Sequence, residues 1–279
     1  MARFLYRLCF ACLCCALSTI GTASAIDATL SKTDHPKPAT VGAPTIITVF
    51  VQEALDSKGH PLPVSSGLLN FFQFFERNAG LHLQAVTVPW NRAKQMTLDG
   101  KGIIWGFSKS PERLMHYRFS ETVMKSRIWA IGYGEPQLAL RSIKDLKNKT
   151  ISVERGVSHG MEFELAKNKI FKIDEDAAQA SARFRKLIAK RSDVLLWGLL
   201  QFDRQDLFLD YLHKIYLPGL RDPELLGKKF YASTTPLFYD SIHFASAKGQ
   251  LENEMKKIDA AIKQGFKSGE LTKLVNVLN

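Results

Sequence analysis

The chain has 279 residues, of which 46% are hydrophobic and 10% aromatic, with 38 lysine and arginine residues against 27 acidic ones. This hydrophobic fraction is typical of a globular protein with a sizeable core and excludes an intrinsically disordered chain. No apolar run reaches the roughly 18 residues that a transmembrane helix needs, which excludes a multi-pass membrane protein.

The first 25 residues have the pattern of a secretory signal peptide. Arg3 and Arg7 precede the apolar stretch 8–20, and Ala23-Ser24-Ala25 supplies a small-residue cleavage site. All four cysteines lie in this segment, so residues 26–279 contain none, which rules out thiol catalysis and cysteine-bound metal there. We therefore predict a cleaved signal peptide (residues 1–25) and a periplasmic protein, for which no nucleic-acid partner is expected.

Strands and helices are predicted to alternate along the rest of the chain. Residues 26–44 are rich in Thr, Pro, Ala and Ser and are expected to be a disordered lead-in. The β-branched run 45–51 predicts a first strand, and the helix after it is expected to be capped by Ser66 and to end at Gly80. We then expect a strand over 81–88, a helix that begins at Pro89-Trp90 and an apolar strand over 103–107.

The second half of the sequence continues this alternation. Its predicted elements are a strand over 149–153, a helix over 158–168, a helix over about 177–190, a strand over 193–197, a C-terminal helix with its apolar stripe over 251–266, and a short helix from Glu270. Such alternation predicts an α/β fold with mainly parallel sheets that helices cover on both faces. The strand-like segments 127–133 and 236–246 are predicted to cross between two lobes.

The sharpest local motif is Trp105-Gly-Phe-Ser-Lys-Ser-Pro-Glu-Arg113. Ser110 can cap a short helix that has Pro111 and Glu112 in its first turn. Ser108 then lies at the carboxyl end of a parallel strand, the edge at which α/β sheets bind ligands. Arg113 can offer its planar guanidinium to a ligand carboxylate, or it can pair with Glu112 or another surface acid.

With its flanking residues, this motif resembles the first lobe of bacterial family 3 extracellular solute-binding proteins, the periplasmic receptors of polar amino acid ABC importers. The matching pattern is Trp90…Leu98-x-Gly100-Lys101…Ser108-x-Ser110-Pro-Glu-Arg113…Phe119-Ser120. The stretch Asp145-Leu-Lys-Asn-Lys149-Thr-Ile-Ser-Val153-x-x-Gly156 is similar to the opening of the second lobe, and Lys248…Leu251…Ile258-Asp-Ala-Ala-Ile262…Gly269-Glu-Leu271 to the closing helix. The resemblance spans residues 45–279 or so.

The resemblance implies a two-lobed type II periplasmic binding fold, in which two hinge strands join the lobes and the ligand is trapped between them. We expect lobe 1 over 45–133, lobe 2 over 134–235 and a return to lobe 1 over 236–279. It further implies a monomer that presents its ligand to a membrane permease or a sensor, without covalent chemistry, and neither a cofactor nor a metal site is expected.

The resemblance also implies the ligand-binding residues. Arg113 matches the arginine that binds the ligand α-carboxylate, Ser108 the hydroxyl residue beside it, and Trp90 the residue at the cleft wall. Ser158 matches a second-lobe hydroxyl residue that completes the anion site at a helix N-terminus. We expect Trp105 to form a second apolar wall.

Several positions depart from the family pattern. The acid that usually contacts the ligand ammonium lies about five residues after the Asp that opens a strand, and counting from Asp193 places Gly198 there. Glu53 is a candidate substitute for this missing acid. A small carboxylate or an aromatic ligand therefore fits the sequence about as well as an amino acid.

A second motif points to another class of protein. Gly156-Val-Ser158-His-Gly160 satisfies G-x-S-x-G, the nucleophile elbow of α/β-hydrolases, between a predicted strand and a predicted helix. Asp193 followed by His213 or His243 supplies the chain order of a catalytic triad. The alternative function is therefore an exported enzyme, either a serine hydrolase that uses Ser158 or a dehydratase on the two-lobed fold. The same Gly and Ser also suit a ligand-binding helix start, which we favour.

Overall fold

The computed structural model describes residues 44–279 apart from 56–58, 135–138, 177–178, 277 and 279. The predicted signal peptide lies outside the described residues, as does almost all of the predicted lead-in. Within the described ranges, every helix is too short or too polar to cross a lipid bilayer.

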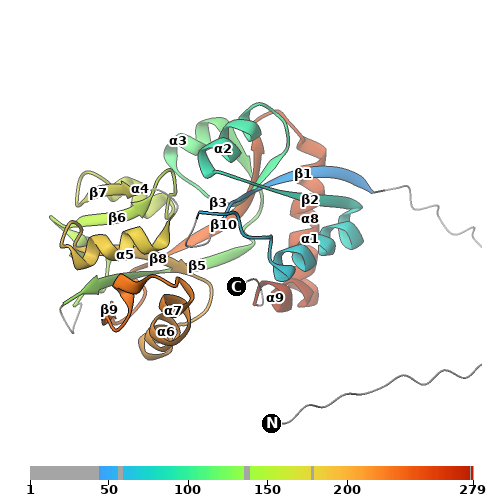
Figure 1. The fold of residues 1–279 in the computed structure, drawn as a ribbon. Helices are drawn as coiled ribbons and strands as arrows, with labels where there is room; N and C mark the ends of the chain where they lie inside the picture. The colour runs from blue at the N-terminus through green and yellow to red at the C-terminus, as the bar shows by residue number, and fades with distance from the viewer. Residues whose placement is uncertain (1–43, 56–58, 135–138, 177–178, 277, 279) are drawn as a thin grey trace, which may run out of the picture. The chain divides into compact units, whose positions relative to one another are not determined.

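Ten strands form one mixed sheet in the described part of the chain (Figure 1). They are β1 (Thr45–Gln52), β2 (Leu81–Val88), β3 (Ile103–Ser108), β4 (Tyr117–Phe119), β5 (Met124–Tyr133), β6 (Thr150–Glu154), β7 (Lys172–Asp176), β8 (Val194–Leu199), β9 (Phe230–Ala232) and β10 (Phe238–Ala247). The main path through the sheet is β2-β1-β3-β10-β5-β8-β6-β7, with β4 beside β10 and β9 beside β5.

The sheet is parallel at both ends and antiparallel in its centre. Strands β1, β2 and β3 are parallel to one another and form, with β4, what we call the first half-sheet; β6, β7 and β8 form a parallel second half-sheet. The two long strands β5 and β10 pair antiparallel with each other and connect these half-sheets. They include most of the predicted crossings 127–133 and 236–246, so the prediction of two parallel regions joined by two crossing strands is confirmed.

Helices cover both half-sheets. The α-helices are α1 (Ser66–Ala79), α2 (Trp90–Leu98), α3 (Pro111–His116), α4 (Met161–Ala166), α5 (Ala180–Ile188), α6 (Gln205–Tyr211), α7 (Leu217–Gly219), α8 (Glu252–Ser268) and α9 (Glu270–Val275). Two 3₁₀ turns, η1 (Ile143–Leu146) and η3 (Pro223–Leu225), and one π-helical turn, η2 (Leu212–Tyr216), complete the described helical structure. Four of the predicted helices, those that begin near residues 66, 90, 252 and 270, start within one residue of the expected position.

The core of the first half-sheet is rich in aromatic residues. Phe71 and Phe75 of α1 pack against Phe244 of β10, with ring centroids 5.9 and 5.2 Å apart. The N-cap of α1 is Ser65, whose Oγ accepts a hydrogen bond from the Leu68 amide, so the predicted cap at Ser66 is wrong by one residue. A slip of one residue is common at helix ends because adjacent serines can both serve as caps.

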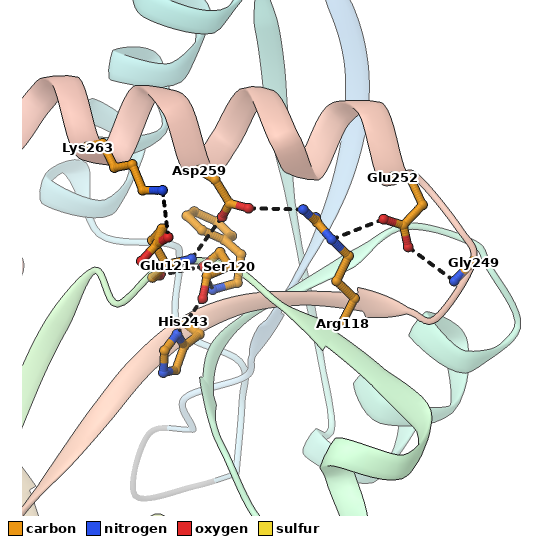
Figure 2. A network of polar contacts seen from close by, with 9 residues as sticks. Arg118, Ser120, Glu121, His243, Gly249, Glu252, Asp259 and Lys263 are labelled. Atoms are coloured by element: carbon orange, nitrogen blue, oxygen red, sulfur yellow. Dashed lines mark hydrogen bonds and ion pairs between the residues drawn. The ribbon is translucent and has the colours of Figure 1, made fainter.

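Helix α8 is fixed to the first half-sheet by a chain of ionic contacts (Figure 2). Arg118 of β4 contacts Glu252 at 3.1 Å and Asp259 at 3.0 Å, which lie about two turns apart on α8. Asp259 also accepts a hydrogen bond from the Glu121 amide, and Lys263 pairs with the Glu121 carboxylate at 2.9 Å. These contacts hold the loop after β4 against α8, and this loop leads directly into the crossing strand β5.

Candidate ligand-binding site

The motif at the end of β3 positions Arg113 as the sequence predicts. Ser110 caps α3, because its Oγ accepts a hydrogen bond from the Arg113 amide at 3.1 Å, and Pro111 occupies the first turn. The side chain of Arg113 turns back over β3: its guanidinium lies 4.1 Å from the centroid of the Phe107 ring, and Nη1 donates to the carbonyl of Ser108 at 2.9 Å. The cap and the aromatic ring together fix one orientation of the guanidinium.

Arg113 also connects the two half-sheets. Its Nη2 donates a hydrogen bond to the carbonyl of Gly156, in the loop after β6, at 3.0 Å. The side chain is buried, burial lowers the pKa of Arg113, and no described carboxylate forms an ion pair with it. The expectation that Arg113 could pair with Glu112 on the surface is therefore not met. A buried guanidinium bonded only to neutral carbonyls favours an incoming anion.

Space for a ligand exists beside Arg113. Arg113 and Gly156 line a polar cavity of about 430 Å³, together with Asn91, Lys94 and Ser110. Gly156 has φ of +76°, which favours glycine, and a Cβ added there would displace the side-chain end of Asn91 on α2. The loop of the second half-sheet thus packs directly on helices of the first.

Ser158 lies in the same loop but does not begin a helix. Its Oγ accepts a hydrogen bond from the Gly160 amide at 3.2 Å, and α4 starts only at Met161. The predicted helix over 158–168 is therefore too long at its N-terminus, because Gly160 has φ of +93° and acts as the N-cap. Ser158 is buried beside His159 and Gly160, within two residues of the carbonyl that Arg113 contacts.

Asp240 is a residue of the site that the sequence analysis missed. It lies on the crossing strand β10, is buried, and accepts a hydrogen bond from the hydroxyl of Ser108. A Cβ on Gly160 would overlap its carboxylate, so Asp240 also touches the loop after β6. Burial raises the pKa of Asp240 to about 7, although the Ser108 hydroxyl and the charge of Arg113 act in the opposite direction. The sequence did contain a sign of it, because an acid within the apolar segment 236–246 is unusual for a buried strand.

Gly198 lies close to Asp240 in the sheet. The resemblance leads one to expect an acid at this position 198. Gly198 is opposite Ile128 in the β5–β8 ladder, and Asp240 is opposite Ser126 in the β5–β10 ladder. A Cβ on Gly198 would lie 2.6 Å from Oγ of Ser126. Side chains at 126 and 128 share a face of β5. Positions 198 and 240 therefore flank Ser126 on one face of the sheet.

Glu53 lines a separate cavity of about 600 Å³ between the end of β1 and helix α5. The acid beside it is Glu154, whose carboxylate accepts a hydrogen bond from the Gln52 amide and lies 3.9 Å from Arg183. Burial raises the pKa of Glu154. The remaining wall is largely aliphatic and aromatic and includes Leu55, Leu62, Tyr211, Ile215, Tyr216 and Leu220. Glu53 is therefore not among the residues that meet at Ser108.

The two predicted tryptophan walls lie in different parts of the first half-sheet. Trp90 is buried against Phe107, with ring centroids 5.7 Å apart, and its Nε1 has no hydrogen-bond partner among the described residues. Trp105 packs into the α1 core against Phe71 and Phe244, at 4.8 and 4.6 Å. The structure thus does not bring Trp105 to the Arg113 side of the sheet.

A β-bulge explains the position of Trp105. In the β3–β10 ladder, Phe107 faces His243 and Trp105 faces the adjacent Phe244, so Gly106 is an extra residue with φ of +80°. Without the bulge, residues 105 and 107 would share a face, as strict alternation predicts. The glycine inside the predicted strand was a sign of this irregularity.

The residues of the alternative catalytic triad are not assembled. Asp193 accepts a hydrogen bond from the Thr150 amide at 2.7 Å, and Nε2 of His213 accepts one from the Phe230 amide at 3.0 Å. Nδ1 of His243 contacts the Ser120 carbonyl at 2.8 Å. Each candidate partner of Ser158 is thus engaged with backbone elsewhere. Among the described residues, no three His, Asp or Glu side chains come close enough to hold a metal ion.

No protein-family model and no curated protein matches the sequence. Solved structures match the fold over most of the chain. The substrate-binding protein of an amino acid ABC transporter has 20% sequence identity and a TM-score of 0.57, over 83% of this chain and 97% of that one. The ancestral amino acid-binding protein AncCDT-1, a precursor of cyclohexadienyl dehydratase, has 16% identity and a TM-score of 0.58, over 83% and 94%.

A third similar structure is the GluR0 ligand-binding core from Nostoc punctiforme in complex with L-glutamate, with 15% identity and a TM-score of 0.57 over 82% of this chain and 96% of that one. These proteins include the class that the sequence motifs resemble, and at this level of identity they establish the fold. The chain therefore has the two-lobed α/β fold of periplasmic binding proteins, with parallel regions joined by two crossing strands.

Proposed function

We propose that the chain is a solute-binding protein that captures a small carboxylate-bearing ligand between its two lobes. The observation that carries this proposal is the position of Arg113, which is buried where the lobes meet and whose guanidinium donates, among the described residues, only to the carbonyls of Ser108 and Gly156. A ligand carboxylate would form stronger, charge-assisted hydrogen bonds than either carbonyl does. Binding would also relieve the cost of burying an unpaired charge.

The known proteins of this fold support the proposal. Two of the three similar structures are amino acid-binding or ABC-transporter proteins by description, and the third is a ligand-binding core that holds L-glutamate. The motif around Arg113 resembles the same class. We accordingly propose that the protein works in the periplasm after removal of residues 1–25, as a monomer, and delivers its ligand to a membrane permease or sensor.

Capture by this fold requires movement but no covalent step. The strands β5 and β10 are the crossings about which the lobes would close, and the contact from Arg113 to Gly156 is one that closing forms. Within this scheme Ser108 and Ser158 offer hydroxyl groups to the ligand, and Trp90 supports the Phe107 ring on which the guanidinium lies. We propose no catalytic residue.

The test is a thermal-shift screen of the purified protein against amino acids, small carboxylates, amines and sugars. A ligand at 100 times its Kd should stabilise the protein by about 2.7 kcal/mol, which shifts Tm by several degrees. Isothermal titration calorimetry of a carboxylate hit should then show affinity reduced about 100-fold in Arg113→Ala, because one partner of a buried charge pair is lost. Arg92→Ala is the matched control, since Arg92 is exposed on α2.

Two results would overturn the proposal. The first is the absence of any carboxylate hit, or a hit whose affinity is the same in Arg113→Ala. The second is labelling of Ser158 by a serine-reactive phosphonate together with ester turnover that Ser158→Ala abolishes, which would establish the hydrolase instead.

A further inference from the structure

The second half-sheet carries an apolar cavity of about 390 Å³ that is separate from the site at Arg113. The described residues that line it all belong to the stretch 209–231, which runs from α6 to β9. Helix α6 packs beside β9 in this part of the fold (Figure 1). The cavity is therefore built within one half of the protein and does not depend on how the two halves meet.

The floor of this cavity is hydrophobic. Leu217, Leu225 and Phe230 line it with exposures of only 5, 2 and 1%, and all three belong to the core of the second half-sheet. Leu226 lies at the rim, with 65% of its surface exposed. An exposed leucine beside an apolar hollow leaves a surface that a hydrophobic ligand would remove from water.

His213 lines the cavity without offering it a hydrogen bond. It belongs to the π-helical turn η2, a rare irregularity that is often found at functional sites. Its Nδ1 contacts the carbonyl of Leu209 at 3.0 Å, and its Nε2 accepts a hydrogen bond from the Phe230 amide at 3.0 Å. These contacts use both ring nitrogens and require the neutral ring with its proton on Nδ1. This part of the wall therefore favours an apolar ligand group over a charged one.

The rim of the cavity is positive. Gly227, with φ of +70°, turns the chain between Leu226 and the pair Lys228 and Lys229, so that the leucine and both lysines line the same cavity. Both lysines are exposed, and neither forms an ion pair with a described carboxylate. No described aspartate or glutamate lines the cavity. An apolar hollow with a positive rim is complementary to an amphipathic anion.

We propose that this cavity binds a medium-chain aliphatic carboxylate, with its alkyl chain against Leu217, Leu225 and Phe230 and its carboxylate beside Lys228 and Lys229. The volume sets the length of the chain. A methylene group fills about as much space as a water molecule in the liquid, roughly 30 Å³, so the cavity holds about a dozen heavy atoms, the size of decanoate. This inference goes beyond the proposed function and does not depend on it.

The experiment is isothermal titration calorimetry of the purified protein with saturated carboxylates from hexanoate to dodecanoate, each below its micelle concentration. Affinity should rise about threefold with each added methylene, because more apolar surface is buried, and should stop rising near decanoate, when the cavity is full. Octanoate should bind about tenfold more tightly than octanol in low salt and more tightly still than octylamine, because only the carboxylate is attracted to the lysines.

Two matched sets of variants test the location. Leu226→Glu places a negative charge at the exposed rim and should weaken decanoate binding at least about 30-fold, whereas Leu207→Glu, on an exposed part of α6 outside the cavity, should not change it. The double variant Lys228→Gln and Lys229→Gln should weaken octanoate binding about tenfold and leave octanol binding unchanged. Lys214→Gln is its control, because Lys214 is exposed and does not line the cavity.

Three results would overturn the inference. The first is no binding of decanoate, or binding that Leu226→Glu leaves unchanged. The second is equal affinity for octanoate, octanol and octylamine, which would mean that the lysines do not recognise the head group. The third is sedimentation of the protein with phosphatidylglycerol vesicles that Leu226→Glu abolishes, without binding of soluble decanoate, which would make this rim a membrane contact.

The outcomes also separate this site from the one at Arg113. Decanoate binding that is unchanged in Arg113→Ala is the expected result, and it leaves the proposed function to the small carboxylates of its own screen. Decanoate binding that is lost in Arg113→Ala and kept in Leu226→Glu would place the carboxylate at Arg113. That result would overturn this inference and support the proposed function.

Discussion

Arg113 of one lobe donates a hydrogen bond at 3.0 Å to the carbonyl of Gly156 in the other, across 43 residues of sequence. The contact depends on how closely the loop after β6 approaches α2, where a Cβ on Gly156 would overlap Asn91. The left-handed conformation of Gly156, with φ of +76°, adds a second reason for glycine. The same residue therefore permits both the fold of the loop and the contact between the lobes.

Gly156→Ala should destabilise the protein by about 1–2 kcal/mol, because backbone strain of about 1 kcal/mol adds to a smaller cost of moving the Asn91 side chain. Combining it with Asn91→Ala should recover part of this loss, since only the overlap is relieved. Gly227→Ala is the control for strain alone, with φ of +70° and no atom within 4 Å of the added Cβ. Urea unfolding measures all four proteins, and equal losses in Gly156→Ala and Gly227→Ala would contradict the close approach.

Trp105 and Trp90 should respond differently to replacement by leucine. Trp105→Leu should lower the free energy of unfolding by about 2–4 kcal/mol, because the ring fills the α1 core, and should leave ligand affinity within about threefold. Trp90→Leu should weaken binding as well, because Trp90 supports the Phe107 ring beneath Arg113. Urea unfolding and calorimetry with a ligand from the screen provide both quantities. If Trp105→Leu lost much affinity and Trp90→Leu did not, Trp105 would have to contact the ligand after all.

The sequence predicts local features of this fold better than contacts between distant segments. The cap at Ser110, and with it the placement of Arg113, follows from neighbouring residues alone. The contact between Ser108 and Asp240 joins residues 132 positions apart and depends on which strands pair. The bulge at Gly106 likewise depends on the partner strand β10, and it moves Trp105 to the other face. Local sequence patterns do not specify which strands pair or in which register, so they could not assign Asp240 to the site.

The ionic network on α8 should owe its stability to Asp259 more than to Lys263. Asp259→Ala should cost about 1.5–3 kcal/mol, because the Arg118 guanidinium and the Glu121 amide both lose a charged acceptor. Lys263→Met should leave the free energy of unfolding almost unchanged, because the pair it forms with Glu121 is exposed to solvent. Urea unfolding of both variants, in low salt and in 0.5 M NaCl, measures the loss of stability in each and how far salt screens it. Equal losses in the two variants would show that the network acts through surface charge alone.

His159 and Asp240 should make opposite contributions to stability between pH 7.5 and 5. The pKa of His159 is lowered from its usual 6.5 to about 4, so the unfolded chain binds the proton more readily and stability falls as the pH drops below 6.5. The pKa of Asp240 is raised from 3.8 to about 7, so the folded protein binds the proton more readily, and this contribution is lost as the pH rises through 7. Each contribution changes by about 2 kcal/mol over this interval, and in the wild type they largely cancel.

Single variants should therefore reveal a pH dependence that the wild type conceals. Relative to the wild type, His159→Gln should gain about 2 kcal/mol on going from pH 7.5 to 5, and Asp240→Asn should lose about as much. Urea unfolding at the two pH values gives the four free energies that each comparison needs, and taking differences removes the contribution of other titrating groups. Parallel pH profiles for Asp240→Asn and the wild type would mean that Asp240 is ionised at pH 5. In that case Asp240 would have to be better solvated or better paired than its burial beside Ser108 implies.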